Sequence, residues 1–367
     1  MRILLLFFFS LALGCATLAQ FQVGNTTITF NDPSRSGGFG SGGGPGRQIQ
    51  TEIYYPANAS GSNVAVAEGQ FPVITFGHGF LMAWDAYSNL WQEFASRGYI
   101  MAFPRTEGGF LPSHQNFALD LVVVNEKMLA LTGNAGSLFF GHVSELSALM
   151  GHSMGGGCAV VAAANNPNVA TLVGLAPAET NVSAIGAATN VAVPSVILSG
   201  SSDGVTSPSA HHIPIYNNLG SDCKHFVSIT GGAHCYYNNS NFNCDFGEAT
   251  ASNGISITRA EQQQITYDYL NAWLDAVLKA SCDGLEAFTG LADSDPRTAV
   301  TSACGGLYPN PCACVGDFNN DSAVNSIDLL LLLGDFGCSA NCLTDLDGDG
   351  LSGTGDLLLF LAAFGNC

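Results

Sequence analysis

Short apolar runs alternate with longer amphipathic stretches between residues 53 and 278, and this alternation constrains the fold more than any other feature of the chain. The short runs predict buried strands, and the longer stretches carry apolar residues at helical spacing. The strand-like runs lie at 72–76, 100–103, 146–150, 170–175, 195–198 and 226–230, and the helix-like stretches at 87–96, 116–131, 155–164 and 259–278. This alternation is typical of βα units. The sequence therefore predicts an α/β protein with a mainly parallel, doubly wound sheet.

The segments before residue 53 and after residue 278 lack this alternation of short apolar runs and amphipathic stretches. Residues 23–30 predict one more strand, and residues 36–46 form a glycine-rich connector. The stretch from 283 to 310 has no strand or helix period, and we expect it to be irregular. In the helix at 259–278, the apolar residues that recur at helical spacing predict one face packed against the sheet. These residues are Ile265, Tyr269, Ala272, Trp273 and Ala276.

Charge and cysteine content narrow the class of protein. The 367 residues include 10 Lys or Arg and 29 Asp or Glu, for a net charge of −19. Nucleic-acid binding requires a basic surface and is therefore not expected. The 12 cysteines indicate disulfides formed in an oxidising compartment. Arg2, the apolar run at 3–13 and the small residues Thr17 and Ala19 predict a secretory signal peptide over 1–19, with a lipoprotein signal ending at Cys15 as the alternative.

The predicted organisation is a signal peptide (1–19), a catalytic domain (20–304), a linker (305–313) and a small C-terminal domain (314–367). Beyond the signal, no apolar stretch reaches the roughly 18 residues needed to cross a bilayer. We expect a secreted, extracellular protein without a transmembrane span.

The strongest chemical motif is Gly151-His152-Ser153-Met154-Gly155, which matches G-x-S-x-G between a predicted strand and a helix of small residues. In a strand-to-helix elbow, the glycines allow close packing and the serine hydroxyl is presented at the turn. Ser153 is therefore the candidate nucleophile.

A serine nucleophile needs a general base, and the base needs an orienting carboxylate. Asp203 follows the strand at 193–198, and His234 lies on a glycine-rich loop after the strand at 226–230. Both positions are at carboxyl ends of strands, where open α/β sheets carry their sites. The other histidines considered are His142, His152, His211, His212 and His225, and the alternative acids are Asp245 and Glu179.

The oxyanion hole requires two backbone donors, one from the residue after the nucleophile and one from the loop after an early strand. Met154 supplies the first donor, and Phe80 in Gly77-His78-Gly79-Phe80 supplies the second. We expect His78 to brace this loop, with a place in the hole itself as the alternative.

The region from Glu52 to about Cys304 resembles the cutinase-type polyester hydrolases, which are dienelactone-hydrolase-like esterases that include poly(ethylene terephthalate) hydrolases. The matching motifs are Tyr54-Tyr55-Pro56, Gly79-Phe80, Gly151 to Gly157, Leu175-Ala176-Pro177, Asp203, Pro214-Ile215-Tyr216 and Gly231 to His234. The resemblance implies an α/β-hydrolase fold and ester hydrolysis by a Ser153, His234 and Asp203 triad, with Phe80 and Met154 as oxyanion donors and no cofactor.

The substrate side departs from that family. The tryptophan that follows its Ala-Pro pair is replaced here by Ala178 and then Glu179. An aromatic platform could come from Trp84, Tyr87, Tyr236 or Tyr237, and we expect substrate contacts from His152, Ala178, Trp84 and Tyr236. Alternative activities are those of a lipase or of a chlorophyllase-like or platelet-activating-factor-acetylhydrolase-like esterase. A non-enzymatic alternative is an inactive binding subunit tethered by the C-terminal domain.

The C-terminal domain holds an internal duplication in which an oxygen-rich loop opens a leucine-rich helix twice. Calcium prefers six to eight oxygen ligands, and the loop positions fit such a site. In the first loop the expected ligands are Asp317, Asn319, Asp321, the Ala323 carbonyl and Asp328, with Asn325 or a nearby water. In the second loop they are Asp345, Asp347, Asp349, the Leu351 carbonyl and Asp356, and we expect one structural calcium ion per loop.

This pair of loops resembles a type I dockerin over residues 314–367, which implies a cohesin-like or cell-surface partner. Gly353 and Gly355 in the second loop depart from the pattern, as do the added Cys338, Cys342 and Cys367.

The cysteines allow three further expectations. Cys158 lies on the apolar helix after the nucleophile and is the expected free, buried thiol. Cys282 and Cys304 are expected to form a bridge that holds the irregular tail to the last helix. Cys235 could pair with Cys223 or Cys244 to brace the His234 loop.

Overall fold

A computed structural model describes residues 20–166, 168–307, 310–319, 321, 323–339 and 342–365. The expected signal peptide over 1–19 lies outside these residues. The chain divides into two compact units: one holds the residues up to Asn271 together with Ala292–Cys304, and the other holds Ala272–Leu291 together with the residues from Gly305 onward. Within the described residues, no helix combines the length and apolarity needed to span a membrane.

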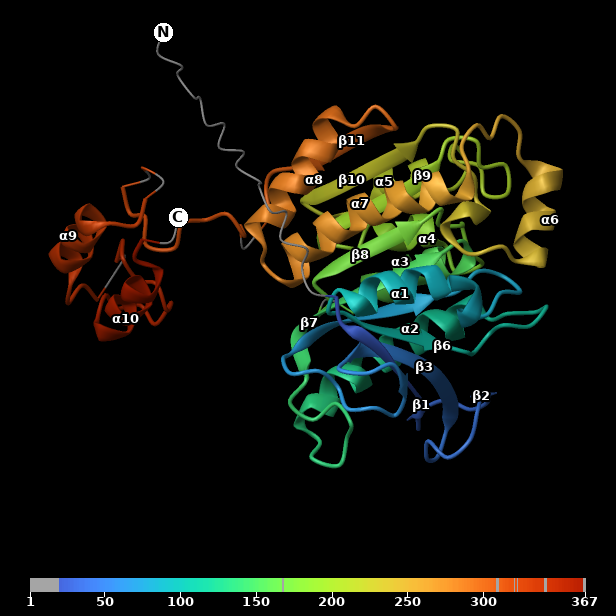
Figure 1. The fold of residues 1–367 in the computed structure, drawn as a ribbon, viewed down its shortest axis with the longest axis horizontal. Helices are drawn as coiled ribbons and strands as arrows, with labels where there is room; N and C mark the ends of the chain where they lie inside the picture. Colours follow the sequence, from blue (N-terminus) through green and yellow to red (C-terminus); the bar gives the residue numbers. More distant parts are fainter. Residues whose placement is uncertain are drawn as a thin grey trace, which may run out of the picture. The chain divides into compact units, whose positions relative to one another are not determined.

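Eleven strands of the described chain form one sheet, in the order β11-β10-β9-β8-β7-β5-β6-β3-β1-β4, with β2 paired to β3 (Figure 1). The six neighbours from β10 to β6 run parallel, whereas β3, β1 and β11 join antiparallel. The strands are β1 (Gln22–Asp32), β2 (Gly38–Phe39), β3 (Arg47–Ala57), β4 (Gly61–Ser62), β5 (Phe71–Gly77), β6 (Ile100–Pro104), β7 (Val143–His152), β8 (Thr171–Leu175), β9 (Ser195–Gly200), β10 (Cys223–Ile229) and β11 (Thr298–Cys304). This mixed α/β sheet fits an α/β-hydrolase-type fold.

The helices of the described chain are α1 (Ser88–Ser96), α2 (His114–Ala130), α3 (Met154–Ala164), α4 (Ala184–Ala188), α5 (His212–Asn218), α6 (Phe242–Ala251), α7 (Arg259–Leu278), α8 (Cys282–Ser294), α9 (Ser326–Asp335) and α10 (Thr354–Ala363), with short 3₁₀ turns at Trp84–Tyr87, Leu131–Gly133 and Cys235–Tyr237. Within the first unit, helices lie on both faces of the sheet (Figure 1). Residues of α2 to α5 share one buried apolar cluster with the sheet. On the other face, α1 meets the first part of α7 through the hydrogen bond from Asn89 Nδ2 to Tyr267 Oη, 3.1 Å (Figure 1).

The packing face predicted for the helix at 259–278 is buried. Within the first unit, Ile265 and Tyr269 of α7 are 2% and 0% exposed. Within the second unit, the rings of Trp273 and Phe288 lie 5.0 Å apart between centroids.

The expectation of irregular structure over 283–310 is wrong. Helix α8 and strand β11 both fall in this stretch, and β11 pairs antiparallel with β10 along the sheet edge. The predicted Cys282–Cys304 bridge is wrong for the same reason. Strand pairing places Cys304 opposite Cys223, and these two form a disulfide, while Cys282 pairs with Cys312. Cys158 is free and buried, as predicted.

The second unit contains the duplicated segment. Its two helices α9 and α10 share a small core in which Val324, Leu332 and Phe360 are buried and the Phe318 ring stacks on Phe360. The equivalent leucines Leu330 and Leu358 are 68% and 69% exposed. The duplication in sequence is therefore matched by a repeated pattern of burial.

Candidate active site

Ser153 occupies the sharp turn between β7 and α3. Its backbone is left-handed, with φ 56° and ψ −123°, a conformation that is costly for a residue with a side chain. The turn is so tight that only glycine fits at the positions two residues before and two residues after the serine. A Cβ atom on Gly155 would lie 2.1 Å from the Gly77 carbonyl oxygen, and a Cβ atom on Gly151 would lie 2.3 Å from the Gly155 carbonyl oxygen. The G-x-S-x-G spacing therefore places the serine on an elbow of the kind that presents a nucleophile.

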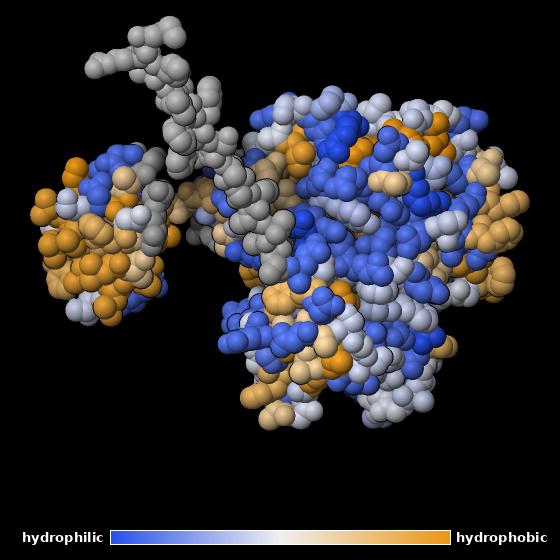
Figure 2. Space-filling model, viewed as in Figure 1, coloured by the Kyte–Doolittle hydropathy of each residue, from blue (hydrophilic) through white to orange (hydrophobic). Residues whose placement is uncertain are grey.

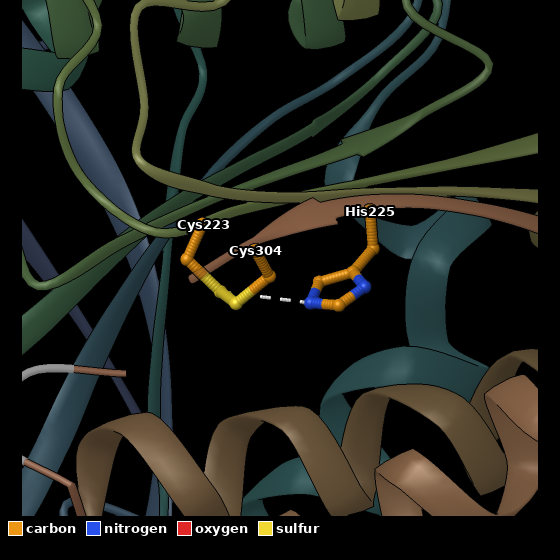
Figure 3. A group of neighbouring side chains, drawn as sticks. All are labelled: Cys223, His225 and Cys304. Atoms are coloured by element: carbon orange, nitrogen blue, oxygen red, sulfur yellow. Dashed lines mark hydrogen bonds between the residues drawn. A yellow bond between two sulfur atoms is a disulfide. The ribbon is translucent and has the colours of Figure 1, made fainter. Parts of the chain in front are cut away.

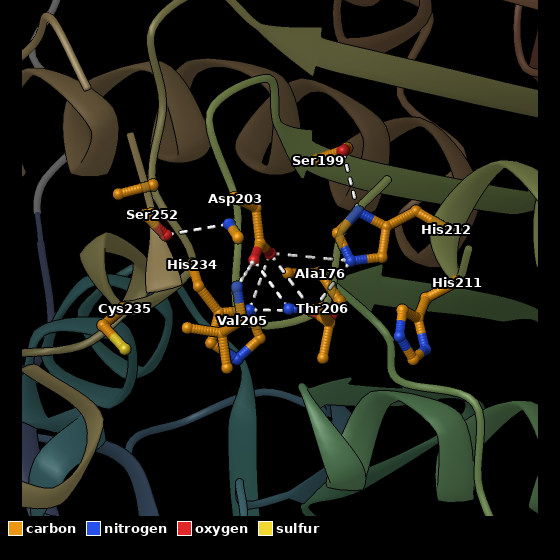
Figure 4. Close-up of polar contacts among 12 residues, drawn as sticks. Ala176, Ser199, Asp203, Val205, Thr206, His211, His212, His234, Cys235 and Ser252 are labelled. Carbon is orange, nitrogen blue, oxygen red and sulfur yellow. Dashed lines mark hydrogen bonds and ion pairs between the residues drawn. The ribbon is translucent and has the colours of Figure 1, made fainter. Parts of the chain in front are cut away.

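Asp203 and His234 are in direct contact across two neighbouring loops (Figure 4). The loop after β9 carries Asp203, and the loop after β10 carries His234. His234 Nδ1 donates to Asp203 Oδ2 at 2.7 Å. The other oxygen of this carboxylate, Oδ1, accepts from the backbone amides of Val205 and Thr206 at 2.9 and 2.8 Å. The imidazole is therefore held with Nδ1 protonated, which leaves Nε2 as the acceptor.

The electrostatics of this pair favour an ionised aspartate. Burial acts to raise the pKa of Asp203, but the hydrogen bond and charge of His234 and the hydrogen bond from the Thr206 amide outweigh burial and hold the pKa below its ordinary value. A carboxylate behind a histidine base stabilises the imidazolium that forms when the base takes a proton.

A threonine and a second histidine lie behind Asp203, and no pattern in the sequence predicts this arrangement. Thr206 Oγ1 is 3.1 Å from Asp203 Oδ2, 2.9 Å from His234 Nδ1 and 3.0 Å from His212 Nε2. His212 Nδ1 lies 2.8 Å from Ser199 Oγ (Figure 4). Burial lowers the pKa of His212 to about 3, so this second histidine is neutral. No local motif marks it, because His212 is only the first residue of a short helix in the sequence.

His152 joins the nucleophile turn to the His234 loop. Its Nε2 donates to the His234 carbonyl at 3.0 Å, and its Nδ1 accepts from the Tyr87 hydroxyl at 2.9 Å. Burial and the nearby His234 lower the pKa of His152 well below its ordinary value. Because the side chain is fully buried and both nitrogens are engaged, the expected substrate contact by His152 is corrected to an internal one.

The loop after β5 packs against the start of α3. The carbonyl oxygens of Gly77 and His78 approach Gly155, and the Gly79 amide donates to Tyr87 Oη at 2.8 Å. His78 is buried, with ring nitrogens 2.9 Å from the carbonyls of Gly79 and Thr106, and burial lowers its pKa. This geometry matches the bracing role expected of His78. Phe80 is the next residue after Gly79, and the Met154 amide belongs to the first turn of α3, where amides lack intrahelical acceptors.

The aromatic residues considered as substrate platforms are mostly covered. Tyr87 and Tyr237 are fully buried. The Arg105 guanidinium lies 4.1 Å from the centroid of the Trp84 ring, and Arg259 lies 4.7 Å from that of Tyr236. Ala178 is half-buried, and its amide donates to the Ser153 carbonyl at 2.9 Å. A hollow of about 280 Å³ beside the Phe80 loop is lined by residues that include Leu81, Trp84 and Arg105.

A disulfide braces the His234 loop. Cys235 pairs with Cys244 of α6, which decides between the two partners considered for it. Arg259 supports the same loop by donating to the carbonyls of Cys235 and Asn238.

A second cysteine and histidine group lies at the sheet edge (Figure 3). His225 Nε2 is 3.6 Å from Cys223 Sγ, and Cys223 is bonded to Cys304. Metal binding by cysteine requires a thiolate, so the oxidised pair offers no such ligand, and the bridge joins β10 to β11. Burial lowers the pKa of His225 to about 4.

In each of the two oxygen-rich loops, three of the expected calcium ligands lie close together. Carboxylate oxygens of Asp317, Asp321 and Asp328 lie within 4.8 Å of one another, as do those of Asp345, Asp347 and Asp356. Asn319 contacts Asp321 through its amide, and Asp349 accepts the Leu351 amide. Asp328 and Asp356 also accept amides from their own loops, for example Phe318 and Leu346. These all-oxygen donor sets fit a hard cation.

The PET hydrolase-like family matches residues 14–259. Cutinase est2 of Thermobifida alba is 26% identical over 220 residues, which cover 59% of this chain and 65% of the relative. A bis(hydroxyethyl) terephthalate hydrolase of Streptomyces coelicolor is 24% identical over 190 residues, which cover 52% of this chain and 56% of that relative. Each alignment thus spans less than two thirds of the relative's length.

Proposed function

This chain belongs to the PET hydrolase-like family, and we propose that it is a carboxylic ester hydrolase that works through an acyl-enzyme on Ser153. The observation that carries the proposal is the 2.7 Å contact between His234 Nδ1 and Asp203 Oδ2, made by loops beside the Ser153 elbow. The His152 ring lies 4.7 Å from the His234 ring between centroids, so the residue before the nucleophile already contacts the base.

The proposed mechanism assigns one role to each group. His234 Nε2 accepts the Ser153 hydroxyl proton while Oγ attacks the ester carbonyl carbon. The Phe80 and Met154 amides hold the resulting oxyanion, and each such donor is typically worth about 3 kcal/mol. His234 then gives the proton to the departing alcohol, which leaves the acyl group on Oγ. Water, deprotonated by His234, releases the acid and restores the serine.

We propose polyesters as the substrate class within the esters. Support comes from the two relatives, whose names are those of a cutinase and a terephthalate ester hydrolase. Four disulfides among the described residues support secretion into an oxidising environment.

For the second unit we propose two structural calcium ions, one in each oxygen-rich loop, with a dockerin-like role in docking to a cohesin-like or cell-surface partner. Support comes from the converging carboxylates in both loops. Acidic side chains at this spacing repel one another unless a cation neutralises them.

The test is hydrolysis of p-nitrophenyl esters from acetate to palmitate beside an amorphous polyester film, for the wild type and Ser153→Ala. We expect short-chain turnover and film erosion, with both lost in the variant. Turnover restricted to small esters would refute the polyester proposal, and no turnover at all would refute the esterase proposal.

A further inference from the structure

Helix α6 carries two exposed aromatic residues, Phe242 and Phe246, on its surface. Phe242 and Phe246 are 83% and 63% exposed, and their rings stack with centroids 6.2 Å apart. The acidic residues of the helix point elsewhere: Asp245 pairs with Arg259 at 2.6 Å, and Glu248 is buried against the Cys235 amide. The exposed face of α6 therefore presents aromatic rings without charge.

This helix is fastened to all three loops of the candidate site. At its N-terminal end, Asn243 Nδ2 donates to the Leu81 carbonyl at 2.9 Å, directly beside Phe80. In the middle, the Cys244–Cys235 disulfide ties it to the residue after His234. At its C-terminal end, the Gly204 amide donates to Ser252 Oγ at 2.8 Å, beside Asp203. The two α6 rings therefore have a fixed position along the rim of the site.

The apolar surface continues from α6 onto those loops. Phe80 is 46% exposed and Val205 is 37% exposed, and Gly247 of α6 faces the Val205 side chain. Figure 2 shows this apolar surface over α6 at the right edge of the molecule. Exposed aromatic groups of this kind mark interaction surfaces. Phe80, Val205, Phe242 and Phe246 together form an apolar stripe. The stripe contains no Lys or Arg, and the chain has a net charge of −19. Both features oppose binding to anionic membranes.

We propose that this stripe seats the surface of a neutral, water-insoluble polyester and holds a chain of it against Ser153. The inference rests on the proposed function and deepens it. The stripe supplies the aromatic contact that Ala178 cannot make, because ester-linked aromatic or aliphatic chains pack on exposed rings. Phe242 and Phe246 are thus specificity-determining residues for polymer over small ester.

The test compares Phe242→Gln/Phe246→Gln with the wild type in the full chain. Readouts are adsorption to a polyester film, film erosion, and turnover of p-nitrophenyl butyrate. We expect adsorption and the ratio of film erosion to soluble-ester turnover to fall about tenfold, which corresponds to about 1.4 kcal/mol. Phe140→Gln is the matched control, because Phe140 is 52% exposed and lies just before β7, at the opposite end of the strand from Ser153. This control should retain the wild-type ratio.

Other outcomes would overturn the inference in distinguishable ways. An unchanged ratio would show that the polymer does not use α6, and a parallel loss on both substrates would make α6 a support of the site. A dimer of the wild type that dissociates in the double variant, seen by analytical ultracentrifugation, would assign the stripe to a second copy of the chain. A wild type inactive on p-nitrophenyl butyrate would instead refute the proposed function.

Discussion

The Tyr87 hydroxyl links the loop that carries Gly79 and Phe80 to the His234 loop through His152, and its removal is a direct test of how the site is held. Tyr87 Oη accepts from the Gly79 amide at 2.8 Å and donates to His152 Nδ1 at 2.9 Å. His152 in turn donates to the His234 carbonyl. Tyr87→Phe keeps the buried ring and removes only the atom shared by these bonds.

The expected loss follows from the groups left unpaired. The Gly79 amide and His152 Nδ1 both lose their partner in a buried place, and each unsatisfied group costs about 1–3 kcal/mol. We expect a fall in the free energy of unfolding of about 2–6 kcal/mol. The Gly79 amide precedes Phe80, whose amide is the proposed oxyanion donor, and a displacement of about 1 Å at a catalytic group can cost about 100-fold in rate. We therefore expect kcat to fall by about 10- to 100-fold with a smaller change in KM.

The assay is urea unfolding together with steady-state hydrolysis of p-nitrophenyl butyrate. Tyr216→Phe is the matched control, since the Tyr216 hydroxyl donates to the Thr301 carbonyl at 3.2 Å in a partly buried place. This control should cost about 1 kcal/mol and leave kcat unchanged. If Tyr87→Phe behaves like Tyr216→Phe in both measurements, the linking role of Tyr87 is refuted.

Three other changes test separate parts of the structure. Asp203→Asn should lower kcat by roughly 10³- to 10⁴-fold because His234 would lose its Nδ1–H acceptor and take the wrong tautomer; a loss below tenfold in p-nitrophenyl ester turnover would contradict the assignment. Burial lowers the pKa of His212 from 6.5 to about 3 in the folded protein. Between pH 6.5 and about pH 3, the unfolded chain therefore binds a proton at His212 that the folded chain does not bind. The free energy of unfolding falls as the pH drops through this range. The wild type should lose about 3 kcal/mol more unfolding free energy between pH 7 and pH 4 than His212→Gln, and equal losses in urea titrations would contradict this. Calcium chelation should expose residues 314–365 to proteolysis and leave soluble-ester turnover intact, whereas an unchanged digestion pattern would count against the calcium sites.

Much of the central fold could be predicted because its strands and helices have clear hydrophobic periods. The run at 72–76 is confirmed as the core of β5, and the stretch at 155–164 lies within α3. The positions of Asp203 and His234 after neighbouring parallel strands also follow from chain order. Strands with this topology bring their carboxyl ends to one edge of the sheet, and the structure brings the two side chains into contact there.

The remaining features depend on contacts between distant parts of the chain. Strand β11 has an exposed, weakly apolar pattern, and it forms because it pairs with the edge strand β10. That pairing also brings Cys304 to Cys223 instead of Cys282. His212 and Ser199 become neighbours of Asp203 only once α5 folds back beside β9. No periodicity in the sequence marks these contacts.

The role proposed for Ser153 is tested most directly by the site of covalent labelling with a fluorophosphonate, read by mass spectrometry of the digested protein. We expect one phosphonate per chain, on Ser153, with labelling slowed at least 100-fold in His234→Ala. Labelling of another serine, or equal labelling rates in the wild type and His234→Ala, would contradict the assignment of Ser153 as a nucleophile activated by His234.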